Sequence, residues 1–310
     1  MRLTLEEAAR RLRAGEIVAF PTETVYGLGA DATNEDAVLK IFETKARPRF
    51  DPLIVHVPDV STAQTLSLGP WEPRALALAE AFWPGPLTLV LPKGPLVPDL
   101  VTAGLETFAV RVPDHPTALE LLRLTARPLA APSANRFGRL SPTTAEAVES
   151  QLGPGLPLLD AGPCRVGVES TVVSLARSEA MLLRPGGLPR EEIEAVVGHL
   201  QIPTKDSLQR ESPGRSIRHY APRTPLRWRG REDHPRSDLG LLQFGTSDEV
   251  GWGAVEDLSP DRDLRKAARR LYEALRRLDG LGLRGLRAEP VPDEGLGQAI
   301  NDRLEKAMQP

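Results

Sequence analysis

The chain has one cysteine and no long apolar run, and each of these shortages excludes a class of protein. Its one cysteine, Cys164, excludes an internal disulfide and a metal site built from several cysteines. No uncharged apolar run reaches the length that crosses a membrane, and the N-terminal residues have no apolar core of the signal-peptide kind. The sequence therefore predicts a cytoplasmic protein with no membrane contact.

Common motifs for phosphate, dinucleotide and metal sites are also missing. The chain has no GxxxxGK(S/T) loop, so any ATP that it binds is not held in the Walker manner. The triplet GLG occurs at 27–29 and 295–297, but neither copy belongs to a GxGxxG fingerprint. There is no HExxH, no cluster of histidine and cysteine, and no GxSxG elbow. A covalent hydrolase and a zinc enzyme are therefore weak interpretations.

Length and charge distribution indicate two domains. At 310 residues the chain is longer than one core usually serves, and its 41% hydrophobic and 26% charged residues are typical of a globular protein. Residues 1–200 carry more acidic than basic side chains, whereas residues 201–310 carry more basic than acidic ones. We expect a first domain over 1–200, a linker over 201–236 and a small second domain over 237–310.

Strand and helix patterns alternate along the first domain. An amphipathic N-terminal helix, in which Thr4 and Glu7 are spaced as a capping box, is followed by helices expected at 34–46, 72–83, 117–124, 142–152 and 189–200. Strands are expected at 16–22, 52–57, 87–92, 107–113, 128–134, 170–176 and 181–186. Because strands often follow one another directly, we expect a twisted mixed sheet with helices rather than pure βαβ winding.

The second domain shows a similar alternation on a smaller scale. A strand is expected at 238–245, and strongly periodic helices are expected at 263–279 and 294–308. This order is typical of a small doubly wound, Rossmann-like α/β domain.

Charged side chains occur at the ends of several expected elements of the first domain. Lys45 and Arg47 stand at a helix end, where a basic residue that complements the helix dipole is the plainer explanation. Arg111 lies inside an apolar strand pattern and requires an anionic partner from the protein or from a ligand. His56 lies in another apolar run, where a half-buried histidine with satisfied hydrogen bonds is the plainer explanation.

Hydroxyl and amide side chains add to these cations. The segment PSANRFGRLSPT contains Ser133, Asn135 and Ser141, and Ser141 is the expected cap of the helix at 142–152, a position that suits phosphate. Ordinary turn and cap residues explain Ser141 equally well. Ser170 and Arg184 follow in ESTVV and LLRPGG. Taken together, these side chains indicate a site for a polyanion.

The expected linker is unusually rich in binding side chains. SPGRSIRHYAP, at 212–222, carries Arg215, Arg218, His219 and Tyr220, and the stretch 205–231 is strongly basic. A solvated basic loop is one explanation, and an anionic ligand nearby is the other.

Seven segments in this order resemble the motifs of the YrdC-like threonylcarbamoyl-AMP synthases: PTETVYGLGADA (21–32), KARPRFDPLIVHV (45–57), FAVRVP (108–113), PSANRFGRLSPT (132–143), ESTVV (169–173), LLRPG (182–186) and SPGRSIRHYAP (212–222). GLLQFG (240–245) and EGLGQAINDRLEKA (294–307) are similar to the extra C-terminal domain of the long, two-domain branch of that family.

The resemblance implies a nucleotidyltransferase reaction. L-Threonine, bicarbonate or CO2, and ATP would give threonylcarbamoyl-AMP and pyrophosphate, with Mg²⁺ brought by the ATP and no metal bound by the protein itself. The product would pass to the machinery that transfers the threonylcarbamoyl group to tRNA, and weak or transient contact with tRNA is compatible with this role. An RNA-binding module is one alternative, although the first domain is acidic and lacks a basic patch interleaved with aromatics. A carbamoyltransferase is the other alternative, but the acylphosphatase and zinc-finger segments of such enzymes are absent.

The resemblance also implies roles for individual residues. Threonine would be bound by Thr22, His56, Arg111 and Ser170. ATP would be bound by Lys45, Arg47, Arg49, Thr107, Ser133, Asn135, Ser141, Arg184 and Tyr220, with Lys45 and Arg47 as the catalytic pair. The linker would cross the cleft as a lid over the active site.

Two positions depart from the family pattern. Ala46 stands where glycine is common, which is a mild change if the backbone there is not at positive φ. Asp51 stands where asparagine is common and is expected to cap the following turn.

Overall fold

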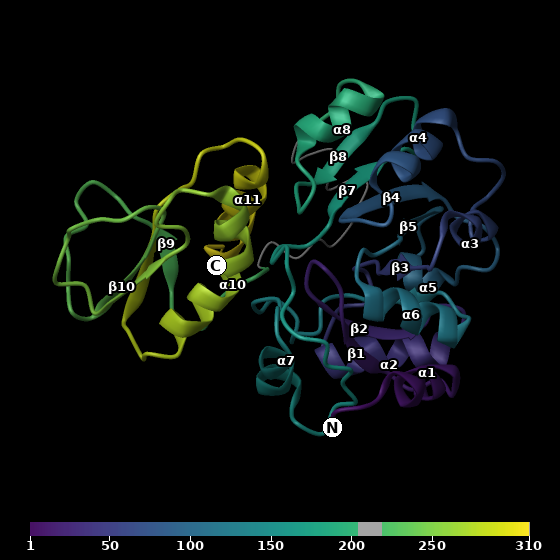
Figure 1. The fold of residues 1–310 in the computed structure, drawn as a ribbon, viewed down its shortest axis with the longest axis horizontal. Coiled ribbons are helices and arrows are strands. Elements are labelled where there is room, and N and C mark those ends of the chain that lie inside the picture. Colours follow the sequence, from purple (N-terminus) through teal and green to yellow (C-terminus); the bar gives the residue numbers. More distant parts are fainter. Residues whose placement is uncertain (204–218, 310) are drawn as a thin grey trace.

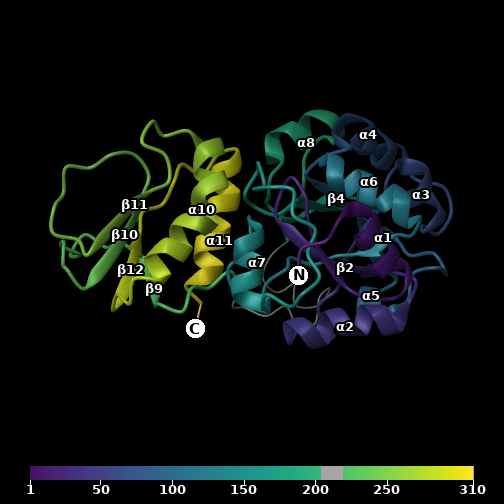
Figure 2. The same ribbon diagram turned by 60° about the horizontal axis from the view of Figure 1, so that its bottom comes forward.

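The computed structural model describes residues 1–203 and 219–309, which form two α/β units around separate sheets (Figures 1 and 2). Within these residues, no helix has both the length and the apolar character needed to cross a bilayer.

The larger unit is built on an eight-stranded sheet with the order β1-β2-β6-β3-β5-β4-β7-β8. Its strands are β1 (Val18–Pro21), β2 (Tyr26–Asp31), β3 (Ile54–His56), β4 (Leu87–Pro92), β5 (Thr107–Arg111), β6 (Leu129–Ala130), β7 (Thr171–Ser174) and β8 (Met181–Arg184). β3 pairs with β5, and β4 with β7, in parallel, while the other neighbouring pairs are antiparallel. The expectation of a mixed sheet is confirmed.

Helices surround this sheet. They are α1 (Leu5–Arg13), α2 (Glu35–Lys45), α3 (Val60–Thr65), α4 (Pro73–Phe82), α5 (Asp99–Thr102), α6 (Pro116–Thr125), α7 (Ala145–Leu152) and α8 (Arg190–Val197). α1 packs against α6, and α4 packs against α8. The capping box at Thr4 and Glu7 is present as expected, and the side chain of Asn34 caps α2.

The smaller unit has a four-stranded, all-parallel sheet with the order β11-β10-β12-β9. It contains β9 (Leu226–Trp228), β10 (Leu239–Gln243), β11 (Ala254–Asp257), α10 (Leu264–Asp279), β12 (Gly285–Ala288) and α11 (Leu296–Ala307). Both helices lie on the face that is turned toward the larger unit, whereas a doubly wound fold has helices on both faces (Figures 1 and 2). On the small sheet, Trp252 from a loop clusters with Leu239 and Leu241. β9 lies inside the range expected to be linker.

One hydrophobic cluster connects the two units. Val25, Leu140 and Val168 of the larger unit pack in the same cluster as Leu271 and Leu275 of α10. Burial of apolar surface therefore holds the smaller unit against the larger one.

The sequence did not predict β2, and one reason is its glycine content. A Cβ atom on Gly29 would lie 2.6 Å from the ring of Phe20 on the neighbouring strand, so a bulkier residue would collide there. Glycine is otherwise unfavourable in strands and weakens the strand pattern in the sequence. Other elements that the sequence did not predict are α3, α5, β9, β11 and β12.

The helix after Ser141 begins later than expected. α7 starts at Ala145, and Thr144 is its cap, accepting a hydrogen bond from the backbone N–H of Ala147 at 3.2 Å. Ser141 is not the cap, because its hydroxyl points into the protein interior and donates to Glu169. The prediction that Ser141 caps this helix is therefore wrong, while its assignment to ATP stays a prediction.

Ala46 ends α2 in the left-handed conformation, with φ 51° and ψ 42°. Alanine was expected to be a mild change here only if its φ is negative. In the structure its φ is positive. An L-residue with a Cβ atom is disfavoured in this region by roughly 1–2 kcal/mol, whereas glycine adopts it freely.

We expect Ala46→Gly to raise the free energy of unfolding by about 1 kcal/mol, since relief of the left-handed strain exceeds the extra entropy of glycine in the unfolded chain. The same change at Ala77, in the middle of α4, should lower the free energy of unfolding by about 1 kcal/mol. Denaturant unfolding measures both. A destabilising Ala46→Gly would show that the alanine is not strained.

Candidate functional site

Arg111 lies at the centre of a buried polar cluster. Its Nε donates to the carbonyl of Gly85 at 3.1 Å, its Nη1 donates to Thr24 Oγ1 at 3.0 Å, and its Nη2 lies 2.5 Å from Glu23 Oε1. Thr22 joins the cluster through its hydroxyl, 2.8 Å from that of Thr24. The anionic partner that burial of Arg111 requires is thus Glu23, a residue that the sequence interpretation missed although it stands inside the PTETVYG motif.

His56 is the neighbour of Arg111 on the adjacent strand. The two residues are paired in the parallel register of β3 and β5, so their side chains lie on the same face of the sheet. Nδ1 of His56 is 3.2 Å from the carbonyl oxygen of Ile54. Burial, with a contribution from the charge of Arg111, lowers the pKa of His56 to about 3, which keeps the imidazole neutral.

Ser170 lies immediately before β7 and is linked to Arg184. Its hydroxyl is 2.7 Å from that of Thr88, and Arg184 Nη2 donates to the same hydroxyl at 3.2 Å and to the Ser170 carbonyl at 2.8 Å. Thr171, the residue after Ser170, and Arg111 contact neighbouring residues of one segment, because Thr171 N donates to Pro86 O and Arg111 donates to Gly85 O.

Lys45 is a buried cation without a carboxylate partner. Its Nζ donates only to the backbone carbonyls of Ser133 and Asn135, and within residues 1–203 and 219–309 no carboxylate lies at ion-pair distance from it. Burial, and then repulsion by Arg47, lowers the pKa of Lys45 well below its ordinary value. A bound anion would restore the charged form.

Arg47 is held beside Lys45 by Asp51. Its Nη2 lies 2.8 Å from Asp51 Oδ2, and its guanidinium stacks over the ring of Phe137 at 5.8 Å. Burial lowers the pKa of Arg47, Asp51 opposes this effect, and the nearby charge of Arg184 adds to it. Asp51, at the position where the family commonly has asparagine, therefore forms an ion pair with Arg47.

The remaining polar residues of PSANRFGRLSPT divide into two groups. Ser133 and Asn135 lie beside Lys45, and the buried Oδ1 of Asn135 has no hydrogen-bond partner among the described residues. Ser141 belongs instead to the cluster around Glu169, to which its hydroxyl donates at 2.5 Å.

Two of the residues predicted to bind ATP, Thr107 and Arg49, are not linked to the others by hydrogen bonds or ion pairs within the described residues. Thr107 lies at the opposite end of β5 from Arg111, and Arg49 is exposed. Neither side chain makes a hydrogen bond or ion pair with another residue that the structure describes.

The described end of the expected linker touches both units. His219 lies 3.9 Å from Asp51 Oδ2, and its ring lies 5.0 Å from that of Phe137. Tyr220 is buried, with its ring 4.9 Å from the guanidinium of Arg303 on α11. Arg215 and Arg218 lie outside the described residues, as does the stretch 204–218 of the proposed lid.

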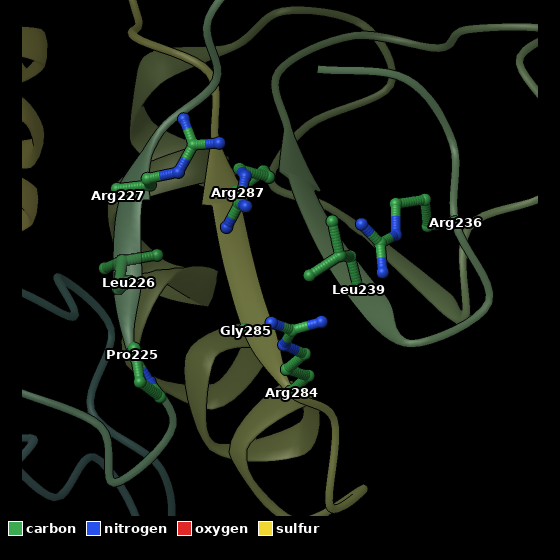
Figure 3. A pocket seen from close by; sticks show the side chains of 8 residues that line it. All are labelled: Pro225, Leu226, Arg227, Arg236, Leu239, Arg284, Gly285 and Arg287. Atoms are coloured by element: carbon green, nitrogen blue, oxygen red, sulfur yellow. The ribbon is translucent and has the colours of Figure 1, made fainter.

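A separate hollow of about 320 Å³ is found at the start of the strands of the small sheet (Figure 3). Four arginines surround it, but their charges are met within the protein: Arg227 and Arg287 both pair with Asp233, and Arg236 and Arg284 lie at Asp238. Lys45 and Arg184, which have no carboxylate at ion-pair distance among the described residues, therefore indicate an anion site more strongly than this hollow does.

Comparisons with known proteins cover almost the whole chain. Residues 10–186 match the model of the Sua5, YciO and YrdC proteins, described as "Telomere recombination", and residues 188–308 match the model described as "Threonylcarbamoyl-AMP synthase, C-terminal domain". The chain is 46% identical to a threonylcarbamoyl-AMP synthase of Bacillus subtilis, with 98% of this chain and 92% of the relative covered. It is 44% identical to that of Pyrococcus abyssi, with 97% and 92% covered.

A solved structure is similar over the same extent. The crystal structure of Pyrococcus abyssi Sua5 complexed with L-threonine has a TM-score of 0.88 and 40% sequence identity, and it covers 99% of this chain and 96% of that one.

The depressed pKa of His56 predicts a pH dependence of stability. Between about pH 6.5 and pH 3 the unfolded chain binds a proton at this position that the folded chain does not. The free energy of unfolding should therefore fall by up to about 1.4 kcal/mol for each pH unit below 6.5. His56→Gln should reduce this slope, whereas the exposed His199→Gln should not; unfolding measured from pH 7 to pH 5 tests this, and equal slopes in all three proteins would contradict it.

Proposed function

Since the chain belongs to the threonylcarbamoyl-AMP synthase family, we propose that it converts L-threonine, bicarbonate and ATP to threonylcarbamoyl-AMP, pyrophosphate and water. The observation that carries this proposal is the likeness, over 99% of the chain, to a Sua5 structure complexed with L-threonine. Two features of the site support it independently.

The first feature is the unpaired positive charge at one end of the site. Lys45 is buried without a carboxylate, and Arg184 likewise has none at ion-pair distance among the described residues, while Arg47 lies close enough for Arg184 to affect its pKa. Buried cations need anionic partners, and a triphosphate supplies them. Asn135 contributes an unused acceptor beside Lys45. We assign the nucleotide to this end, with Ser133 and Tyr220 at its margin.

The second feature is the cluster of Thr22, His56, Arg111 and Ser170, which we assign to threonine. A threonine carboxylate would share the Arg111 guanidinium with Glu23, and the neutral His56 would not compete for that carboxylate. Hydroxyl groups of Thr22 and Ser170 are suited to the amino and hydroxyl groups of the substrate.

The proposed chemistry is transfer of an adenylyl group. The amine of threonine and CO2 form a carbamate; a carbamate oxygen then bonds to the α-phosphorus of ATP, and the bond from that phosphorus to the bridging oxygen breaks to release pyrophosphate. No protein nucleophile is needed, because such a step depends on positioning and on charge neutralisation. Lys45 and Arg47 would supply the neutralising charge.

Mg²⁺ is proposed to arrive with ATP as part of the substrate. No group of three or more His, Cys, Asp or Glu side chains suited to a metal ion occurs in the described parts of the chain, and Asp51, the acidic residue beside the nucleotide end, is paired with Arg47. The phosphates and water would therefore provide most of the magnesium ligands.

We further propose that the product passes to the machinery that modifies tRNA, with at most transient contact between this chain and tRNA. Residues 1–200 would carry the reaction, and residues 201–236 would cross the cleft, with His219 and Tyr220 touching the nucleotide side. The comparisons give no support to an RNA-binding module or to a carbamoyltransferase.

Release of pyrophosphate should require both L-threonine and bicarbonate in addition to ATP. Lys45→Ala and Arg47→Ala should each raise the activation barrier by about 2 kcal/mol or more, roughly a 30-fold loss of kcat/KM, since each removes a preorganised charge. The exposed Lys266→Ala should match the wild type. Pyrophosphate release without threonine, or a near-normal kcat/KM in both variants, would contradict the proposal.

Arg111→Lys should raise the KM for threonine by tenfold or more while changing the KM for ATP little, because a point charge replaces a planar fork that binds a carboxylate through two hydrogen bonds. Steady-state kinetics with each substrate varied in turn measures this. If Arg111 serves only to hold Glu23, the variant should instead lose stability in denaturant unfolding, with the KM for threonine unchanged.

A further inference from the structure

Glu169 stands where the two units of the protein meet. It is 6% exposed and precedes Ser170, one of the residues assigned to threonine. Its carboxylate accepts hydrogen bonds from Ser141 Oγ at 2.5 Å, from the hydroxyl of Tyr272 at 2.9 and 3.0 Å, and from Arg303 Nε at 2.7 Å. Two of its three partners, Tyr272 on α10 and Arg303 on α11, belong to the smaller unit.

This carboxylate is ionised, and its charge is fully buried. Burial raises the pKa of Glu169, but Arg303, Arg184 and the hydrogen bond from Ser141 outweigh burial and bring the pKa to about 2. A buried charge tolerates little displacement, because loss of any partner leaves part of it unsolvated. The smaller unit supplies two of the three carboxylate partners and therefore helps to hold Glu169 in place.

Two side chains of the proposed site, Ser170 and Arg184, depend on that position, and Ser141 is held beside Glu169 as well. Ser141 donates its hydroxyl to Glu169, and Arg276 of α10 donates to the Ser141 carbonyl at 3.2 Å. Ser170 is the next residue along the chain, and Arg184 donates hydrogen bonds to its carbonyl and hydroxyl. A shift of Glu169 would consequently move side chains assigned to both ATP and threonine.

The backbone around Glu169 is fitted closely to α10. A Cβ atom on Gly167, which has φ 86°, would lie 2.3 Å from the Cα atom of Arg269 and 2.5 Å from the carbonyl of Ala268. Tyr220 packs in the same hydrophobic cluster as Val168 and Tyr272, with its ring 5.9 Å from that of Tyr272. Such contact between backbones fixes the distance between the two units.

From these contacts we infer that Glu169 is a positioning residue through which Arg303 and Tyr272 of the C-terminal unit complete the synthase site. The inference rests on the proposed function, since it assigns to the C-terminal unit a part in binding the substrates of that reaction. A role in holding the units together, without effect on the substrates, is the competing explanation.

The test uses the full-length protein and four variants. Tyr272→Phe removes one hydroxyl from Glu169 and keeps the aromatic packing, while Arg303→Met removes the charge and Arg303→Lys retains it. Arg277→Met is the matched control, because Arg277 lies on α10 with its side chain exposed and paired with Glu273. Pyrophosphate release gives kcat and the KM for ATP and for threonine, and thermal unfolding reports stability.

Tyr272→Phe should raise the KM for ATP and for threonine by about tenfold, the effect of one hydrogen bond to a charged group. Arg303→Met should have a larger effect, Arg303→Lys should recover part of it, and Arg277→Met should behave as wild type. Should Arg303→Met fail to fold, Tyr272→Phe still decides the question.

The measurements distinguish failure of the proposed function from failure of the positioning role of Glu169. If the wild-type protein releases no pyrophosphate with all three substrates, the proposed function fails. If the wild type is active but Tyr272→Phe and Arg303→Met have lower melting temperatures with both KM values unchanged, the proposed function stands and the positioning role of Glu169 is overturned.

Discussion

The ion pair between Glu169 and Arg303 is the contact on which the arrangement of this protein most depends. Both side chains are buried, and they lie 134 positions apart in the chain. A carboxylate in such surroundings must be matched by charge and by hydrogen bonds, so the helices of the small unit and the loops of the large one are held in a single relative position. The shared hydrophobic cluster supplies attraction between the units, but apolar contacts are non-directional and do not by themselves determine that position.

Unmatched charge, rather than the size of a cavity, identifies the site. Four arginines line the hollow at the start of the small-sheet strands, yet Asp233 and Asp238 neutralise them. Among the residues that the structure describes, Lys45 has only carbonyl oxygens for partners, and its burial makes an anionic ligand favourable. Such unneutralised positive charge suits the proposed adenylyl transfer, in which phosphate charge must be stabilised.

Local patterns in the sequence predicted the elements whose causes are local. The capping box at Thr4, the cap at Asn34 and the apolar run of β4 each depend on residues close together in the chain, and all three are present. Ser141 failed as a cap because a distant carboxylate binds its hydroxyl, and β2 was missed because Gly29 is required by packing against Phe20. Whether alanine at position 46 is a mild change could not be decided before its φ was known, and the structure shows it to be positive.

The sequence alone determined the family, the mixed sheet and the identity of the cationic and hydroxyl groups, because short motifs carry residue types and their order. Tertiary structure decided which of these groups meet. It paired Arg111 with Glu23, placed Asp51 on Arg47, left Thr107 and Arg49 apart from the rest, and brought α10 and α11 to Glu169. Apart from Arg47 and Asp51, which are four positions apart, these pairings depend on contacts between segments that are remote in the chain, and the periodicity that reveals a helix or a strand contains no record of them.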